Sequence, residues 1–213
     1  MKKIRLYQNT ALSLGNSIEL SKDNRHHLNK VLRFPYGKNI TIFNGDGFDY
    51  DAKVQRLKKI TSISIVSKLK NDSESKLNLT LAQGIAKGEK MDFLIQKSIE
   101  LGVTSIIPMQ LERSVVRLKG DRAQKKIEHW QKIANHACEQ SGRAVIVNIC
   151  QPTLLSELLG NQNHNGFVLH HRANISLAQM PEQSRATILI GPEGGLTEKR
   201  LLIQQTLDLS HSY

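Results

Sequence analysis

A glycine-rich loop near the end of the sequence is the first candidate for chemistry. It follows the aliphatic stretch 186–190 and precedes LTEK, a predicted first turn of a helix. Glycines allow positive φ and let a ligand approach bare backbone. A strand, a glycine loop and a helix in succession place a ligand at the carboxyl edge of a parallel sheet. The candidate site residues are Ile190, Gly191, Pro192, Glu193, Gly194 and Gly195.

The spacing of these glycines does not identify the ligand. It fits neither the dinucleotide motif G-x-G-x-x-G nor the phosphate loop G-x-x-x-x-G-K-[ST]. The simpler alternative is a tight connection in which the glycines serve only the turn. Nearby, His170 and His171 end the predicted strand 166–170, which makes one of them a plausible neighbour of a ligand. A lone histidine pair is more often structural, and no metal site is predicted because no third ligand has suitable spacing.

Three arginines lie where loops leave predicted elements. Arg113 and Arg117 follow the predicted strand 103–108, and Arg143 follows the predicted helix 121–140. Guanidinium groups are suited to bidentate phosphate contacts. The alternative is that these are solvated surface arginines, which is the usual role of a single arginine. No Ser-His-Asp or Cys-His arrangement emerges from this order, so the sequence identifies no general base.

The charge distribution indicates a nucleic-acid partner. The net charge is +11, of which +8 belongs to residues 1–76 and +3 to residues 77–213. A basic excess concentrated in one segment is typical of nucleic-acid binding, although a merely basic protein would also show it. Aromatic residues make up 5% of the chain. Base stacking on an extended platform is therefore not expected, and shape and phosphate contacts would dominate.

Residues 1–70 predict a small β-barrel, followed by a polar linker at 71–76. The strand patterns are at 4–7, 17–20, 40–43, 48–54 and 62–66, and the sequence NGDG at 44–47 predicts a hairpin. A short helix is expected at 24–33, with Asp23 as its cap. Its apolar side would carry Leu28, Val31 and Leu32.

Residues 77–213 predict an α/β domain with a mainly parallel sheet, because strands and helices alternate. The expected strands are 77–83, 103–108, 144–149, 166–170 and 186–190. The expected helices are 90–101, ending at Gly102, then 121–140, 154–159 and one after Thr197. No apolar run of about 18 residues and no secretory signal is present, and the two cysteines lack metal-like spacing. These features predict a cytoplasmic protein with no membrane span.

Several ordered blocks of sequence carry a resemblance to a known family. They are HHL at 26–28 with VLR at 31–33, and the segments 43–47, 83–92, 96–103, 112–117, 139–143, 168–170 and 190–195. Together they resemble the RsmE-type 16S ribosomal RNA uracil-N3-methyltransferases of the SPOUT class. The resemblance implies an N-terminal PUA-like barrel that binds RNA and a C-terminal SPOUT-type α/β domain with a trefoil knot. It also implies a homodimer acting on the small ribosomal subunit.

The resemblance also assigns roles to residues. S-adenosylmethionine would be held by the backbone around Leu169, His170 and the segment 190–195. Arg113 and Arg117 are candidates for holding the RNA and the anion that develops on the uracil. For RNA binding we expect Arg5, Arg25, Arg33 and Arg143.

One departure from the family pattern leads to a second hypothesis. The family's L-G-x-R-[IV]-L-R stretch, which closes the knot, is not found in the segment 199–213. We therefore expect this chain as written to bind S-adenosylmethionine poorly, with an incomplete knot. The alternative function is an RNA-binding protein with little or no catalysis. A small-molecule hydrolase is a more distant alternative.

Overall fold

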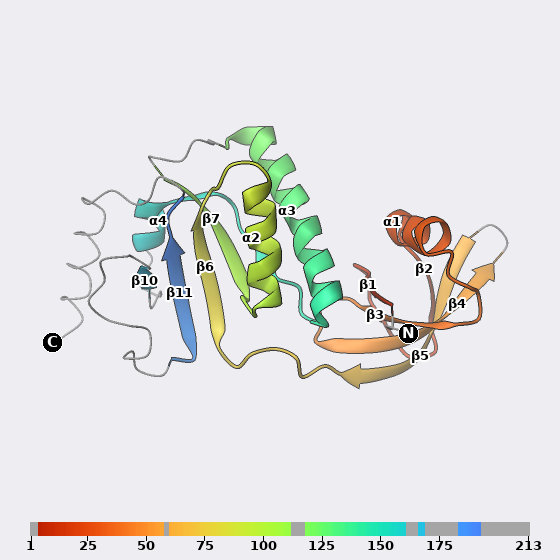
Figure 1. Ribbon diagram of the computed structural model, residues 1–213. Coiled ribbons are helices and arrows are strands. Elements are labelled where there is room, and N and C mark those ends of the chain that lie inside the picture. Colours follow the sequence, from red (N-terminus) through yellow and green to blue (C-terminus); the bar gives the residue numbers. More distant parts are fainter. Residues whose placement is uncertain (1–3, 58–59, 112–117, 161–165, 169–182, 193–213) are drawn as a thin grey trace. The chain divides into compact units, whose positions relative to one another are not determined.

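The computed structural model describes residues 4–57, 60–111, 118–160, 166–168 and 183–192 (Figure 1). The chain divides into two compact units. Unit 1 contains residues 1–75 and 134–147, and unit 2 contains residues 76–133 and 148–213. Helix α3 (Gly120–Ser141) therefore contributes residues 134–141 to unit 1 and residues 120–133 to unit 2. The domain boundaries expected from the sequence, at 70 and 77, stay predictions.

Unit 1 is built on a five-stranded sheet in the order β1-β3-β4-β5-β2. The strands are β1 (Arg5–Tyr7), β2 (Ser17–Glu19), β3 (Asn39–Phe43), β4 (Phe48–Leu57) and β5 (Ile60–Lys70). β1 and β3 are parallel, and the other neighbours are antiparallel. The hairpin predicted at 44–47 joins β3 to β4, and Gly45 and Gly47 adopt the positive φ that it needs.

The core of unit 1 follows the period-two pattern of β4. Tyr50, Ala52 and Val54 are fully or almost fully buried, as the alternation in the sequence predicts. They pack in one cluster with apolar side chains from β1, β3, β5, η1 and the connections on either side of β2: Leu6, Leu12, Leu20, Leu28, Ile40, Ile42, Ile63 and Ile65.

The predicted helix at 24–33 is partly wrong. Helix α1 (Lys22–His26) continues as a π-helix, η1 (His27–Val31). Ser21 rather than Asp23 is the cap, because the Ser21 hydroxyl accepts a hydrogen bond from Asn24 N at 3.2 Å. The wider π turn rotates Val31 away from the side of the helix that carries Leu28. Leu28 is buried, whereas Val31 is 61% exposed and Leu32 is 40% exposed.

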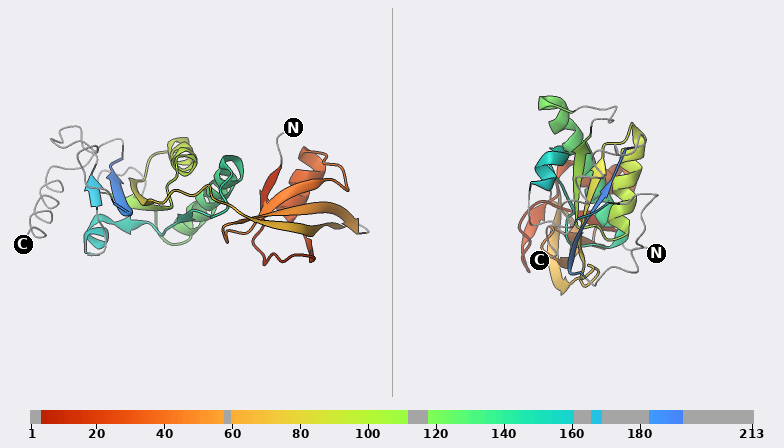
Figure 2. Two further views of the ribbon diagram at one scale, coloured as in Figure 1. Left: turned by 90° about the horizontal axis from the view of Figure 1, so that it is seen from below. Right: turned by 90° about the vertical axis from the view of Figure 1, so that its left-hand side faces the viewer.

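Unit 2 is a parallel sheet in the order β10-β11-β6-β7-β8, with β9 also pairing with β7. Its strands are β6 (Asn78–Gly84), β7 (Ser105–Gln110), β8 (Asn148–Ile149), β9 (Thr153–Leu154), β10 (Gly166–Val168) and β11 (Arg185–Ile190). Helices α2 (Glu89–Glu100) and α4 (Leu155–Leu159) lie on opposite faces of the sheet (Figure 2). On the α4 face, Leu155 and Leu158 pack against Ala82, Met109 and Leu189 of three neighbouring strands.

Most of the elements predicted for unit 2 are confirmed, with corrections at 144–154. The strand expected at 144–149 is reduced to the two residues of β8, and β9 was not predicted. Three expectations lie outside the described residues. They are the end of the expected strand 166–170, at residues 169–170, the helix after Thr197, and the trefoil knot, which depends on segments such as 169–182 and 193–213. Gly102 has φ of 100° and follows Leu101, the C-cap of α2, which confirms the predicted helix end.

Helix α3 has the apolar stripe that its sequence predicts. Ala123, Ile127, Trp130, Ala134 and Ala137 are all buried. In unit 2, Asp92 of α2 connects the two helices, because its carboxylate accepts from Trp130 Nε1 at 3.1 Å and pairs with His129 Nε2 at 2.8 Å. Within the described part of the chain, no helix has both the length and the apolar character needed to cross a membrane.

Candidate functional site

The candidate site lies at the carboxyl edge of the parallel sheet, where β6 and β11 end side by side. Gln83 of β6 is in register with Ile190 of β11. Beyond this pair the two backbones come very close. A Cβ atom on Gly84 would lie 2.5 Å from Pro192 N, 2.6 Å from Pro192 Cδ and 2.9 Å from the carbonyl carbon of Gly191. Since the φ of Gly84 is not positive, this position requires glycine for space rather than for conformation.

Gln83 fixes this edge and also presents an unused acceptor. Its side chain is 2% exposed, and Nε2 donates to Gly84 O at 2.9 Å and to Gly191 O at 3.3 Å. Among the described residues, the buried Gln83 Oε1 has no hydrogen-bond partner. Because a buried acceptor without a donor is unfavourable by about 1–3 kcal/mol, Oε1 suits a ligand that carries an N–H or O–H group.

The structure describes part of the predicted cofactor set. Ile190 and Gly191 are partly exposed and Pro192 is buried, all at the end of β11. The remaining members, Leu169, His170, Glu193, Gly194 and Gly195, lie outside the described residues. The same holds for Arg113 and Arg117.

The chain that flanks Arg113 and Arg117 starts and returns at this same edge. Leu111 directly follows β7, and Leu118 N donates to the side-chain Oε1 of Gln110, the last residue of β7, at 3.2 Å. Both Leu111 and Leu118 are buried. The hydrogen bond therefore anchors the returning chain next to the carboxyl end of β7.

Two of the four arginines expected to bind RNA, Arg5 and Arg143, are held in ion pairs inside unit 1. Arg143 is 5% exposed, and its guanidinium donates to both carboxylate oxygens of Glu74, at 2.9 and 2.5 Å. Arg5 pairs with Asp49 at 2.6 Å and donates to the carbonyl oxygen of Arg143 at 3.2 Å. These contacts favour a structural role for Arg5 and Arg143 in place of a direct RNA contact.

The same network holds the end of α3 within unit 1. Tyr7 N donates to Glu139 Oε1 at 2.7 Å, and the Asn71 side-chain amide donates to Gly142 O at 3.0 Å. The other carboxylate oxygen of Glu139 binds His136 Nδ1 at 2.9 Å, and this hydrogen bond raises the pKa of His136. Charge-assisted bonds to backbone groups of this kind position the chain strongly.

The other two predicted arginines lie on the surface of unit 1. Arg25 pairs with Glu19 at 2.5 Å and stays about one-third exposed. Arg33 is exposed and has φ of 46°, a left-handed conformation that is unfavourable for a side chain larger than glycine. Within the described residues Arg33 forms no ion pair, so its guanidinium is accessible to an anion.

Titratable groups give no general base at the described part of the site. Burial raises the pKa of the Cys138 thiol, but Cys138 belongs to unit 1 and its thiol faces Val145 O. Among the described residues, no group with a shifted pKa lies at the carboxyl edge of β6 and β11. The described part of the chain also holds no cluster of three or more potential metal ligands.

Sequence reasoning did not select Gln83 and Gly84 as site residues. The available signal was a glutamine and a glycine ending a buried strand, which is also compatible with ordinary packing. Only the approach of Pro192, more than 100 residues later in the chain, reveals their role.

Two family models match this chain. One, described as an RNA methyltransferase domain, matches residues 73–206, and one, described as an RNA methyltransferase PUA domain, matches residues 20–66. Together with the two observed sheets, these matches confirm the predicted fold class, a PUA-like unit followed by a SPOUT-type α/β unit.

Relatives and solved structures agree with the models. The ribosomal RNA small subunit methyltransferase E of Buchnera aphidicola from Acyrthosiphon pisum is 36% identical over 91% of this chain and 79% of its own. The enzyme of the same name from Bacillus subtilis is 34% identical over 81% of this chain and 72% of its own.

Two solved structures are similar over almost the whole chain. A Neisseria gonorrhoeae ribosomal RNA small subunit methyltransferase E bound to S-adenosyl methionine is 36% identical, with a TM-score of 0.87. A Legionella pneumophila protein with the bound cofactor SAM is 34% identical, with a TM-score of 0.92. Each alignment covers 97% of this chain and 86% of the other.

Proposed function

Because the chain belongs to the RNA methyltransferase family, we propose that it transfers a methyl group from S-adenosylmethionine to N3 of a uridine in 16S ribosomal RNA. The observation that carries this proposal is the likeness to proteins named small subunit methyltransferase E, at 36% identity over 91% of the chain. The further proposals are that the protein acts on the small ribosomal subunit, in the cytoplasm, as a homodimer.

The carboxyl edge of β6 and β11 is the proposed cofactor site. Gln83 would accept a hydrogen bond from the cofactor at Oε1, and the exposed backbone of Ile190 and Gly191 would contact it directly. Leu169, His170 and residues 193–195 complete the proposed set. When bound, S-adenosylmethionine supplies a methyl group on a positively charged sulfur, which makes that carbon electrophilic.

The chain's own task is to prepare the uracil. N3 of uracil carries a proton, which must leave as the nitrogen forms its new bond to carbon, so negative charge develops on the ring. Preorganised cations near that ring lower the barrier more than they would in water. We assign this role to Arg113 and Arg117, because the chain around them leaves the sheet at Leu111 and returns at Leu118, beside the same edge.

Site-specific mapping tests the activity. We would incubate the full chain with S-adenosylmethionine that carries a labelled methyl group. The substrate is either small-subunit RNA or whole subunits, and modified nucleosides are identified by mass spectrometry. We expect label in N3-methyluridine at one position. Label in another nucleoside would refute the N3 assignment, and no label with either substrate would refute catalysis by this chain.

A matched arginine pair tests the assigned role of Arg117. Arg117→Ala should lower kcat more than it lowers RNA affinity, because the contact strengthens as charge develops. Arg185→Ala is the control, since Arg185 is exposed at the amino end of β11, at the opposite edge of the sheet. Equal losses of rate and affinity in Arg117→Ala would make it a binding residue only, and an unchanged rate would remove it from the site.

A further inference from the structure

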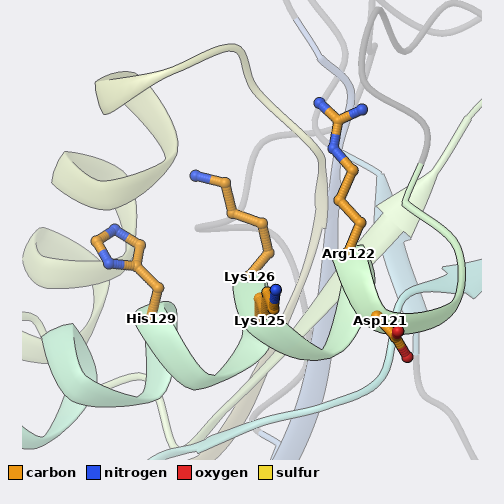
Figure 3. Close-up of a pocket in the computed structure, with 5 residues that line it drawn as sticks. All are labelled: Asp121, Arg122, Lys125, Lys126 and His129. Atoms are coloured by element: carbon orange, nitrogen blue, oxygen red, sulfur yellow. The ribbon is translucent and has the colours of Figure 1, made fainter.

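A basic hollow lies along the first half of α3, in unit 2. It has a volume of about 550 Å³ and is lined by Asp121, Arg122, Lys125, Lys126 and His129 (Figure 3). Arg122, Lys126 and His129 extend to one side of the helix, whereas Asp121 points away from them. The spacing of three, four and seven residues places the four basic side chains on one helical face, which we call the α3 basic face.

Within the part of the chain that the structure describes, most cations of this face are not neutralised by carboxylates. Among the described residues, Arg122, Lys125 and Lys126 form no ion pair. Lys126 Nζ lies 6.0 Å from the centre of the Trp130 ring, which orients its stem. The nearby carboxylate of Asp92 is already hydrogen-bonded to His129 and Trp130. On α3 itself, Glu128 accepts from Gln124 Nε2 at 3.0 Å, and Asp121 points away from the basic side chains.

The face begins at the sheet edge that carries the candidate site. The hydrogen bond from Leu118 N to Gln110 Oε1 ties the chain two residues before α3 to the carboxyl end of β7. In Figure 1 the start of α3 and the carboxyl ends of β6 and β11 lie at the same end of unit 2. Asp92 holds the other end of the face against α2. The face is therefore anchored at both ends and starts beside the sheet edge where we propose that the uracil is presented.

We propose that the α3 basic face binds the phosphodiester backbone of the RNA on either side of the target nucleotide. This inference rests on the proposed function and adds an RNA site within the methyltransferase unit. Arg122 and His129 are separated by about 10 Å along the helix at 1.5 Å per residue. That length exceeds the axial rise of about 3.4 Å per phosphate in one stacked strand, so the face spans several nucleotides. The positive end of the α3 dipole adds to the attraction.

Salt dependence of RNA binding tests the face directly. The triple variant Arg122→Gln, Lys125→Gln, Lys126→Gln is compared with wild type for binding to a small-subunit RNA transcript. Three phosphate contacts contribute about 2 to the slope of log affinity against log salt, at about 0.7 per contact for a single strand. Between about 50 and 200 mM salt, wild type should therefore lose roughly 20-fold more affinity than the triple variant.

A single substitution elsewhere in unit 2 serves as the charge-matched control. Lys97→Gln on α2 changes the net charge by the same amount as Lys125→Gln, but Lys97 already pairs with Glu100 at 2.6 Å. We expect Lys125→Gln to lower the slope by about 0.7 and Lys97→Gln to leave it unchanged. Equal changes in both would reduce the effect to general charge and overturn the proposal.

The outcomes separate this inference from the proposed function. If wild type methylates uridine and the triple variant keeps the wild-type salt slope, the activity stands and the RNA site on α3 is refuted. If the triple variant loses affinity for whole subunits while its binding to naked RNA is unchanged, the face contacts a ribosomal protein and the proposal is also wrong. Cofactor binding by calorimetry should be equal in wild type and triple variant, which shows that the sheet edge is intact.

Discussion

Replacing Gly84 with alanine tests the geometry of the candidate site with one added methyl group. That methyl would lie 2.5 Å from Pro192 N and 2.6 Å from Pro192 Cδ, whereas real Cβ contacts shorter than 3.0 Å are essentially absent. Neither neighbour is the free end of a flexible side chain, so the two strand ends must separate. Overpacking of this kind destabilises a protein by about 1–3 kcal/mol.

The cost can appear in stability or in cofactor binding. If the strand ends stay in place, the midpoint of thermal unfolding should fall by about 2–12 °C for a chain of this size. If the segment at Gly191 and Pro192 moves to admit the methyl, the same free energy should instead weaken S-adenosylmethionine binding by about 5- to 150-fold. Thermal unfolding and titration calorimetry on the same preparations measure the two quantities.

Gly166→Ala is the control for the substitution itself. Gly166 begins β10 in the same sheet, its φ is not positive, and a Cβ there has nothing within 4 Å. We expect this change to be neutral or stabilising by up to about 1 kcal/mol, because alanine restricts the unfolded chain. The reasoning about the sheet edge would be refuted if Gly84→Ala matched Gly166→Ala in both stability and cofactor affinity.

Three further predictions concern unit 1. Arg143→Met should lower the free energy of unfolding by about 3 kcal/mol, measured by urea titration. This is the lower end of the range for a broken buried pair, because 24% of the Glu74 side chain is exposed. Adding Glu74→Gln should recover part of the loss. The hydrogen bond to Glu139 raises the pKa of His136, so its stabilisation is complete below about pH 6.5 and is lost as the pH rises through the raised pKa. His136→Gln should therefore lower the urea midpoint more at about pH 5.5 than at about pH 8.5, and an equal effect at both would contradict this. Arg33→Gly should raise the free energy of unfolding by about 1 kcal/mol, because glycine relieves the left-handed φ. The same change should weaken RNA binding, and unchanged RNA affinity would place the RNA contact elsewhere.

The fold was largely predictable because its signals are periodic and local. Two examples are the alternation of buried and exposed side chains through Tyr50, Ala52 and Val54 and the apolar stripe of α3 through Trp130. Each pattern depends only on residues that are close in the sequence. The failures came where geometry changes within a few residues. The π turn at His27–Val31 exposes Val31, and no propensity rule for an α-helix predicts that rotation.

The candidate site was predictable only in part. The glycine loop after β11 identified one strand end, but its closest partner, Gly84, is brought there by the parallel pairing of β6 with β11. Arg143 shows the opposite error. A guanidinium near a helix end resembles a phosphate ligand in sequence, and only the distances to Glu74 reveal an internal ion pair. The roles of Arg113 and Arg117 stay predictions.

The discontinuity of unit 1 has a consequence for how the protein is made. The ribosome releases residues 1–75 well before residues 134–147, which supply the last part of α3 and the partners of Tyr7, Asn71 and Glu74. At about 5–20 residues per second, the 72 residues from 76 to 147 take on the order of 4–14 seconds to synthesise. During that interval the nascent barrel strands carry the Glu74 carboxylate and the Tyr7 amide without their native partners. Completion of unit 1 therefore waits for synthesis of the middle of the chain, although most of its own residues are made first.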